Sequence, residues 1–255
     1  MGLLLSYLGV HVVGRGIVFV DLALGQISML GVAVANFIGK DQTLVSIIFT
    51  MVGAFLLSFI KIKDKRLKQE AIIGIVYAFA SAATVLFISK SPHGESDISE
   101  VLFGSVFTVT NEQILTMAVT FGIIGLAHAV FRKKFFRLTE KFENHEIEEI
   151  GVFNLWNFLF YLSIGMAIVL AVRSAGVIPV FSYLIIPPVA AILISRKKVS
   201  MIIISMVIGV LGSFFGLFFS AHYDFPAGSS VVAVLGAIFG LLAVVRWGIN
   251  LFSAK

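Results

Sequence analysis

Residues 176–198 read GVIPVFSYLIIPPVAAILISRKK, and this stretch decides which fold the chain adopts. Its apolar run is long enough to cross a bilayer, yet it contains Pro179, Pro187 and Pro188 and stops at three basic residues. Each proline removes a backbone donor and crowds the carbonyl group one turn earlier. In hydrocarbon, such breaks persist only where neighbouring helices or a cavity satisfy the freed carbonyls. The prolines therefore predict a hinge or gate inside a membrane-spanning bundle, and the basic residues place its end at the cytoplasmic surface.

The composition of the whole chain is that of a membrane protein. Hydrophobic residues make up 59% of its 255 residues, charged residues only 13%, and the mean hydropathy is +1.04. A soluble domain carries about twice that charged fraction. The apolar residues come in blocks of the length needed to span about 30 Å of hydrocarbon. We therefore predict an all-α, polytopic integral membrane bundle with eight or nine transmembrane segments, forming one domain over residues 1–255.

Basic residues fall on every second connection between the apolar segments. The segments are 2–13, 17–38, 43–60, 71–89, 113–131, 153–172, 177–195, 201–221 and 230–245. The basic clusters are KIKDKRLK (61–68), RKKFFRLTEK (132–141) and RKK (196–198). Because basic clusters belong on the cytoplasmic side, we expect the N-terminus outside and the C-terminus inside. The same rule accounts for the formal net charge of +5, so no nucleic-acid partner is expected.

Asp21 is an ionisable residue at membrane depth, in IVFVDLALGQISMLG (17–31). Such a residue costs at least about 2.5 kcal/mol on insertion scales, so it usually faces a cavity or a partner. Gln26 and Ser28 follow on the same segment, and one interpretation is a polar stripe along a translocation path. The alternative is that Asp21 lies at the cytoplasmic interface and pairs with Arg15.

Two outer loops carry imidazole and carboxylate groups, which suit zinc or manganese. The residues are His93, Glu95 and Asp97 (HGESD, 93–97), and His222 and Asp224 (HYDFPAGSS, 222–230). Each set is a candidate metal site. The alternative for the first is a polar loop without a metal, and for the second a turn set by Pro226 and Gly228.

The sequence predicts no catalytic site. His11 and His128 stand alone on apolar segments and are predicted to be hydrogen-bonded core or interfacial histidines. The segment HEIEEIG (145–151) is not the HExxH metalloprotease pattern, because its fifth position is Glu149. There is no Walker A sequence and no dinucleotide-type glycine fingerprint. We therefore expect no cofactor on this chain, and any ATP must be hydrolysed by a partner.

Four stretches carry a resemblance to a known family, in order along nearly the whole chain. They are LGVHVVGRGIVFVDLALGQISMLGVAVA (8–35), QEAIIGIVYAFASAATVLFIS (69–89), GVIPVFSYLIIPPVAAILISRK (176–197) and DFPAGSSVVAVLGAIFGL (224–241). The last two are the more specific: a proline-containing apolar run before a basic turn, then D-x-P-x-G opening the final helix. The chain resembles the permease subunits of bacterial metal-ion ABC importers of the zinc, manganese or iron type, the ABC-3 family.

This resemblance implies a permease domain that imports a divalent metal ion by alternating access across the bacterial cytoplasmic membrane, surrounded by lipid. It implies two permease copies, two ABC ATPase subunits and an extracytoplasmic metal-binding protein. The turn around Ala190–Ser200, with Ser195, Arg196, Lys197 and Lys198, would dock on an ATPase. Pro187 and Pro188 would then act as a hinge, and Ser182 and Tyr183 would line the path.

The chain departs from the family pattern in two places. Many members carry Asp-Ala-x-x-His on the second helix, where the metal passes. Alignment on Gly31 puts Gln26 at the histidine position and Leu22 at the aspartate position, with Asp21 one residue earlier. An amide oxygen is a poorer zinc ligand than imidazole. The first segment is also shorter than the family norm, as expected if the start codon has been clipped.

Two function hypotheses remain at this stage. The leading hypothesis is an ABC import permease for a divalent transition metal. The alternative is a secondary transporter of a small solute that uses an ion gradient. Secondary transporters often place several charged residues near the midplane, whereas Asp21 is nearly alone here. Co-purification of an ATPase subunit would distinguish the two.

Overall fold

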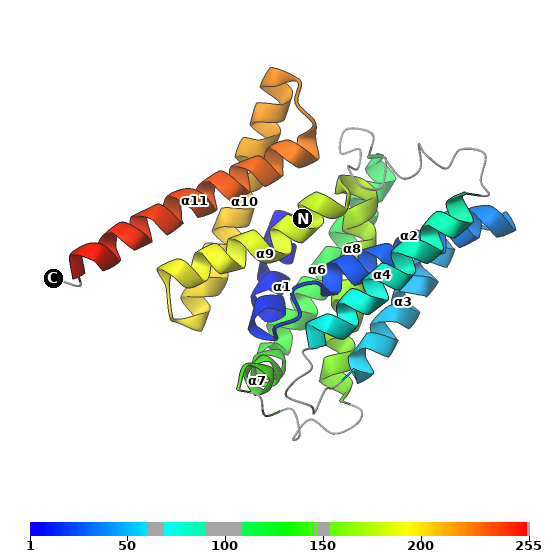
Figure 1. Ribbon diagram of the computed structural model, residues 1–255, viewed down its shortest axis with the longest axis horizontal. Helices are drawn as coiled ribbons and strands as arrows, with labels where there is room; N and C mark the ends of the chain where they lie inside the picture. The colour runs from blue at the N-terminus through cyan, green and yellow to red at the C-terminus, as the bar shows by residue number, and fades with distance from the viewer. Residues whose placement is uncertain (61–68, 90–108, 145, 147–153, 254–255) are drawn as a thin grey trace.

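The computed structural model of the chain describes residues 1–60, 69–89, 109–144, 146 and 154–253. Within these ranges all regular structure is helical and no strand is present. The helices are α1 (Gly2–Gly14), α2 (Val20–Ile38), α3 (Gln42–Phe59), α4 (Gln69–Ile88), α6 (Asn111–Val130), α7 (Arg132–Glu143), α8 (Leu155–Ala175), α9 (Val177–Ile194), α10 (Lys198–Tyr223) and α11 (Ala227–Ser253). The predicted all-α bundle is confirmed (Figure 1).

The predicted number of transmembrane segments also agrees with the structure. Eight of the described helices are long and apolar enough to cross a membrane. α1 is apolar as well, but it has only 13 residues, fewer than the roughly 20 that a helix needs to span the hydrocarbon. α1 does not stand alone, because it packs between α9 and α10 in the middle of the bundle (Figure 1).

The basic connection predicted at 132–141 is a helix, α7, and this is the main departure from the sequence expectation. Phe135, Leu138 and Phe142 recur at intervals of three and four residues, and all three side chains are buried. This spacing gives an amphipathic helix one apolar face and leaves its basic residues on the other. The density of lysine and arginine hides this period, so composition alone predicts a connection at this position.

Local signals fix several helix ends. The side chain of Asp41 accepts a hydrogen bond from the backbone at the start of α3, and Asn154 does the same for α8. Thr110 and Gln113 form a reciprocal capping box at the start of α6. Gly176 separates α8 from α9 with φ 85° and ψ 166°, a conformation that is essentially restricted to glycine. The chain therefore turns from α8 into α9 at a single residue.

Burial divides the helices into an inner and an outer group. α2, α8 and α9 are the most buried of the candidate spans, and α8 contributes Phe160, Ile164 and Ile168 to the core. α4, α6, α10 and α11 present large apolar side chains to the surroundings, such as Phe79 and Leu86 on α4. Exposed apolar faces of this extent are what a lipid environment requires of the outer helices of a membrane bundle.

Small residues let α1 approach α9 and α10 closely. A Cβ atom added to Gly9 would overlap the carbonyl oxygen of Leu184 on α9, and one added to Gly209 on α10 would overlap Ser6. The hydroxyl of Ser205 on α10 donates a hydrogen bond of 2.8 Å to the carbonyl of Ser6. Close backbone contact of this kind is a main source of helix association in membranes, so α1, α9 and α10 pack as one group.

Candidate functional site

The three prolines of α9 do not have the same effect. Pro187 and Pro188 lie buried inside the helix, whereas Pro179 is its third residue. A proline in the first turn removes no intrahelical hydrogen bond, because the amide groups there have no partner within the helix. Only Pro187 and Pro188 therefore interrupt the hydrogen bonding of α9. The carbonyl groups that they leave without a helical donor are four residues earlier, on Tyr183 and Leu184.

α1 packs directly against the interrupted part of α9. The carbonyl oxygen of Leu184, which Pro188 leaves without its helical donor, is the atom that lies against Gly9. Any side chain larger than hydrogen at Gly9 would displace this contact. The proline break is thus covered by the backbone of a neighbouring helix, as the sequence argument required for a break at membrane depth.

The predicted coupling segment Ala190–Ser200 is mostly helical. α9 continues to Ile194 and α10 begins at Lys198, so the turn itself comprises only residues 195–197. The hydroxyl of Ser195 accepts a hydrogen bond of 3.2 Å from the amide of Lys197. Arg196 and Lys197 are exposed. The basic, exposed surface at this end of α9 is therefore a three-residue turn that joins two long helices.

α7 lies beside this turn, which the sequence did not indicate. The ammonium group of Lys198 forms an ion pair of 2.6 Å with Glu140 and lies 3.9 Å from Glu143, both on α7. Lys198 therefore links α7 to the start of α10 and is engaged within the chain. The apolar spacing of Phe135, Leu138 and Phe142 is the signal that could have identified α7 as a helix in advance.

Asp21 is buried near the start of α2 and does not pair with Arg15. One of its carboxylate oxygens, Oδ1, has no hydrogen-bond partner among the described residues. The guanidinium of Arg15 instead donates to Thr139 on α7 at 3.1 Å and to Asn157 on α8 at 3.0 Å. The pairing alternative from the sequence is therefore wrong, and Asp21 is a buried carboxylate with an unpaired oxygen.

The polar residues of α2 do not form one continuous stripe. Ser28 lies seven residues after Asp21, which is two helical turns, and both side chains are buried. Gln26 lies five residues after Asp21 and so points about 140° away around the helix axis. Its side chain is half-buried. Asp21 and Ser28 therefore share a face of α2, and Gln26 belongs to another.

Ser182 and Tyr183 are buried on α9 and have partners within the bundle. The hydroxyl of Ser182 donates to the carbonyl of Ile178 at 2.9 Å, and the hydroxyl of Tyr183 is 2.6 Å from that of Ser213 on α10. Within the described part of the chain, no hydrogen bond joins any two of the five residues predicted to line the path. Tyr183 points at the contact between α9 and α10.

The two histidines that stand apart in the sequence meet in the structure. The hydroxyl of Tyr7 lies 3.2 Å from Nε2 of His11 and 3.3 Å from Nδ1 of His128. The outer nitrogens are also engaged, since His11 reaches Thr139 at 2.9 Å and His128 reaches Ser163 at 2.9 Å. The prediction of hydrogen-bonded core histidines is confirmed. What the sequence missed is that both belong to one network joining α1, α6, α7 and α8.

We expect Thr139→Val to destabilise the protein by about 1–3 kcal/mol, because it leaves two buried polar groups, on His11 and Arg15, without a partner while keeping the side-chain shape. Thermal unfolding in detergent should show a melting temperature lower by about 2–10 °C. Thr50→Val is the matched control, because Thr50 is buried but bonds only to the carbonyl of Ser46 in its own helix. Equal shifts in the two variants would contradict the network.

The candidate metal residues remain a prediction. His222 and Asp224 are exposed at the turn between α10 and α11, where His222 stacks on Phe218 and Asp224 ends α10 with φ 53°. Among the described residues, no three histidine, cysteine or acidic side chains are grouped so that they could hold a metal ion. His93, Glu95 and Asp97 lie outside the residues that the structure describes.

A comparison with known protein families matches residues 1–246 to the ABC 3 transport family. The chain belongs to this family. The chain is 27% identical over 236 residues to the manganese transport system membrane protein MntC of Listeria monocytogenes. This match covers 92% of the chain and 82% of that protein. It is 26% identical over 236 residues to the manganese import system permease protein ScaB of Streptococcus gordonii, covering 91% and 82%.

The fold of this ABC 3 chain is also found among solved structures. PsaBC from Streptococcus pneumoniae, solved in complex with a Fab, superimposes with a TM-score of 0.77 and 25% sequence identity. The match covers 94% of this chain and 86% of the PsaBC chain. The similarity therefore extends over nearly all the helices described above and is not limited to one motif.

Proposed function

We propose that this chain is the membrane-spanning permease subunit of an ABC importer that moves a divalent transition metal ion, manganese foremost, into the cytoplasm. The observation that carries the proposal is the course of α9: a buried helix broken at Pro187 and Pro188 runs directly into the exposed basic turn at 195–197. The similarity to two membrane proteins named for manganese transport supports the choice of cargo. Zinc and iron remain second candidates, since their ligand preferences overlap.

The proposed partners follow from the surfaces of the chain. Residues 195–197 form a docking site for an ABC ATPase, which supplies the ATP hydrolysis. An extracytoplasmic metal-binding protein delivers the ion to the opposite face, and a second permease copy completes the pore. In this proposal the assembly lies in the cytoplasmic membrane of a bacterium, and no cofactor is bound by the permease itself.

The proline break gives the coupling a mechanical basis. Force applied by the ATPase at residues 195–197 acts on the end of α9, and the interruption at Pro187 and Pro188 is where that helix bends most easily. Gly9 holds α1 against the same point, so α1 moves together with the part of α9 that it touches. Switching between two packed arrangements of such a group is how alternating access is achieved in transporters built of rigid helices.

Asp21 is the proposed cation-binding position along the path. Its unpaired Oδ1 is a hard oxygen ligand on a buried part of α2, and oxygen ligands suit manganese better than zinc. Gln26, Ser28, Ser182 and Tyr183 remain candidates to line the path around it. The outer-loop residues His93, Glu95, Asp97, His222 and Asp224 remain candidates to receive the ion first.

Reconstitution tests the proposal directly. Vesicles that contain this chain, its ATPase and the metal-binding protein should accumulate radioactive manganese only when ATP is present on the ATPase side. Vesicles with the chain alone should not accumulate it. Uptake by the chain alone, driven by a proton or sodium gradient, would instead support the secondary-transporter hypothesis and contradict this proposal.

Charge reversal at the turn should uncouple transport from ATP hydrolysis. We expect Arg196→Glu with Lys197→Glu to lower manganese uptake about two- to 30-fold, because each exposed ion pair with the ATPase contributes about 0.2–1 kcal/mol. Uptake and ATPase stimulation in reconstituted vesicles are the measurements. The matched control, Lys40→Glu with Arg246→Glu, changes the net charge equally at exposed sites outside residues 195–197. Equal losses in the two variants would exclude docking at the turn.

A further inference from the structure

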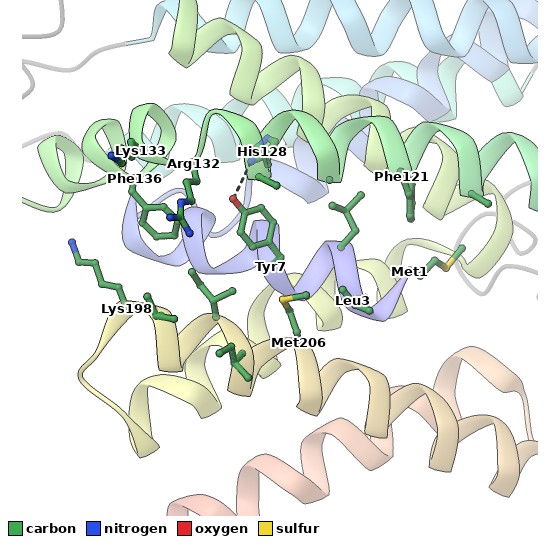
Figure 2. Close-up of a pocket in the computed structure, with 18 of the residues that line it drawn as sticks. Met1, Leu3, Tyr7, Phe121, His128, Arg132, Lys133, Phe136, Lys198 and Met206 are labelled. Carbon is green, nitrogen blue, oxygen red and sulfur yellow. Dashed lines mark hydrogen bonds between the residues drawn. The ribbon is translucent and has the colours of Figure 1, made fainter.

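A large groove lies between α1, α6, α7 and α10 (Figure 2). Its volume is about 1050 Å³, and most of its length is apolar, with Leu3, Phe121 and Met206 among the lining residues. Ile114 on α6 and Ile203 on α10 also line it, and these residues are 50% and 57% exposed. The groove is therefore open at the side of the bundle and is not an internal cavity.

The groove runs along two helices that are candidate membrane spans, α6 and α10. Its occupant at that depth has to be apolar, because water in a groove lined by hydrocarbon side chains finds no hydrogen-bond partners. The polar side chains on this apolar length of the wall are already engaged, because the hydroxyl of Tyr7 lies within 3.3 Å of both His11 and His128. A ligand for this groove must therefore carry its polar part at an end.

One end of the groove is basic. Arg132, Lys133 and Lys198 line it there, together with Glu140, as Figure 2 shows for the three cations. Glu140 is bound to Lys198 at 2.6 Å, and no ion pair or hydrogen bond to another described residue engages Arg132 or Lys133. These two residues follow the last residue of α6, Val130, so their charges lie where a membrane span ends.

We infer that this groove binds an anionic phospholipid, with an acyl chain against the apolar walls of α6 and α10 and the phosphate headgroup beside Arg132 and Lys133. Basic pockets between transmembrane helices on the cytoplasmic side hold anionic headgroups in this way. Arginine and phosphate form paired, charge-assisted hydrogen bonds. An apolar helix from a second copy would fill the groove but leave Arg132 and Lys133 unpaired. The two positive charges therefore favour an anionic phospholipid.

The experiment compares two lipids with the same acyl chains. Phosphatidylglycerol or phosphatidylcholine is titrated into the delipidated full chain, and lipid retained per chain is counted by native mass spectrometry. We expect phosphatidylglycerol to bind between about five- and 25-fold more tightly, because each basic side chain near an anionic lipid contributes about five-fold. Arg132→Ala with Lys133→Ala should abolish this preference. The control, Arg137→Ala with Arg246→Ala, removes two exposed cations that do not line the groove and should preserve it.

A second pair of variants tests the apolar part of the groove. Gly122 lines the groove and Gly74 on α4 does not, and a Cβ atom added at either position meets nothing within 4 Å. Gly122→Leu should therefore fold, occupy the groove and lower retention of phosphatidylglycerol, whereas Gly74→Leu should not. Equal retention of the two lipids by the wild type would overturn the inference. So would a Gly122→Leu variant that changes the oligomeric state but retains the lipid, because the groove would then seat a second copy.

Discussion

Replacing Asp21 with asparagine is expected to lower manganese uptake about 10- to 100-fold without destabilising the fold. Removing a residue that only hydrogen-bonds to a metal ligand already lowers metal affinity or activity about 10- to 100-fold. Here the proposed ligand itself is removed. Asparagine keeps the shape of the side chain and removes a buried charge whose Oδ1 has no partner among the described residues. Burying a carboxylate oxygen that has no hydrogen-bond partner is costly, so the variant should melt at the wild-type temperature or above it.

Lower uptake together with an unchanged or higher melting temperature would show that Asp21 acts in transport and does not stabilise the fold. Uptake is measured in vesicles with the ATPase and the metal-binding protein, and thermal unfolding is measured in detergent on the same preparation. Thr84→Val on α4 is the control, because Thr84 is buried, bonds only to the carbonyl of Ala80 in its own helix and is not part of the proposed path, so it should lower uptake only slightly. If Asp21→Asn transports manganese at the wild-type rate, Asp21 does not contact the ion and the proposed path lies elsewhere.

Replacing Gly9 with alanine is expected to destabilise the protein by about 2–3 kcal/mol, although alanine normally favours a helix. The added Cβ atom would overlap the carbonyl carbon and oxygen of Leu184, which are backbone atoms and cannot rotate away. α1 and α9 must then separate at the point where Pro188 interrupts α9. Thermal unfolding should show a fall of roughly 5–10 °C, and ATP-driven uptake should fall with it.

Two other glycines give the matched comparison for Gly9. Gly74 on α4 and Gly122 on α6 are also inside helices, but a Cβ atom added at either meets nothing within 4 Å. Alanine at these positions should leave stability unchanged or raise it by up to about 1 kcal/mol, because glycine costs that much in a helix. If Gly9→Ala behaves like these two variants, α1 does not pack tightly on the proline break.

The predicted apolar segments agree with the helices because a long run of hydrophobic residues is a strong local signal. All nine predicted segments correspond to helices, and α9 ends at Ile194, one residue from the predicted Ser195. The error at α7 has a physical cause: its basic residues lower the average hydropathy, which conceals the spacing of Phe135, Leu138 and Phe142. Periodicity, not composition, carries the information in a short amphipathic helix.

The hydrogen-bond partners in the candidate site could not be predicted from the sequence. Arg15 and Asp21 are six residues apart, and proximity along the chain suggested that they pair. The structure instead gives Arg15 two partners on other helices, Thr139 and Asn157, which are more than 120 positions away. His11 and His128 are joined through Tyr7 in the same way. No spacing rule predicts such partners, because they depend on which helices become neighbours.

The sequence by itself determined the fold class, the number of spanning segments and the position of the proline break, because hydrophobic length and the missing amide of proline act within a few residues of the chain. Only the tertiary structure decided that Gly9 covers the break, that Lys198 pairs with Glu140 on α7 and that Asp21 keeps an unpaired oxygen. These features arise from contacts between helices that are distant in the sequence, and close packing fixes them only when the whole bundle has assembled.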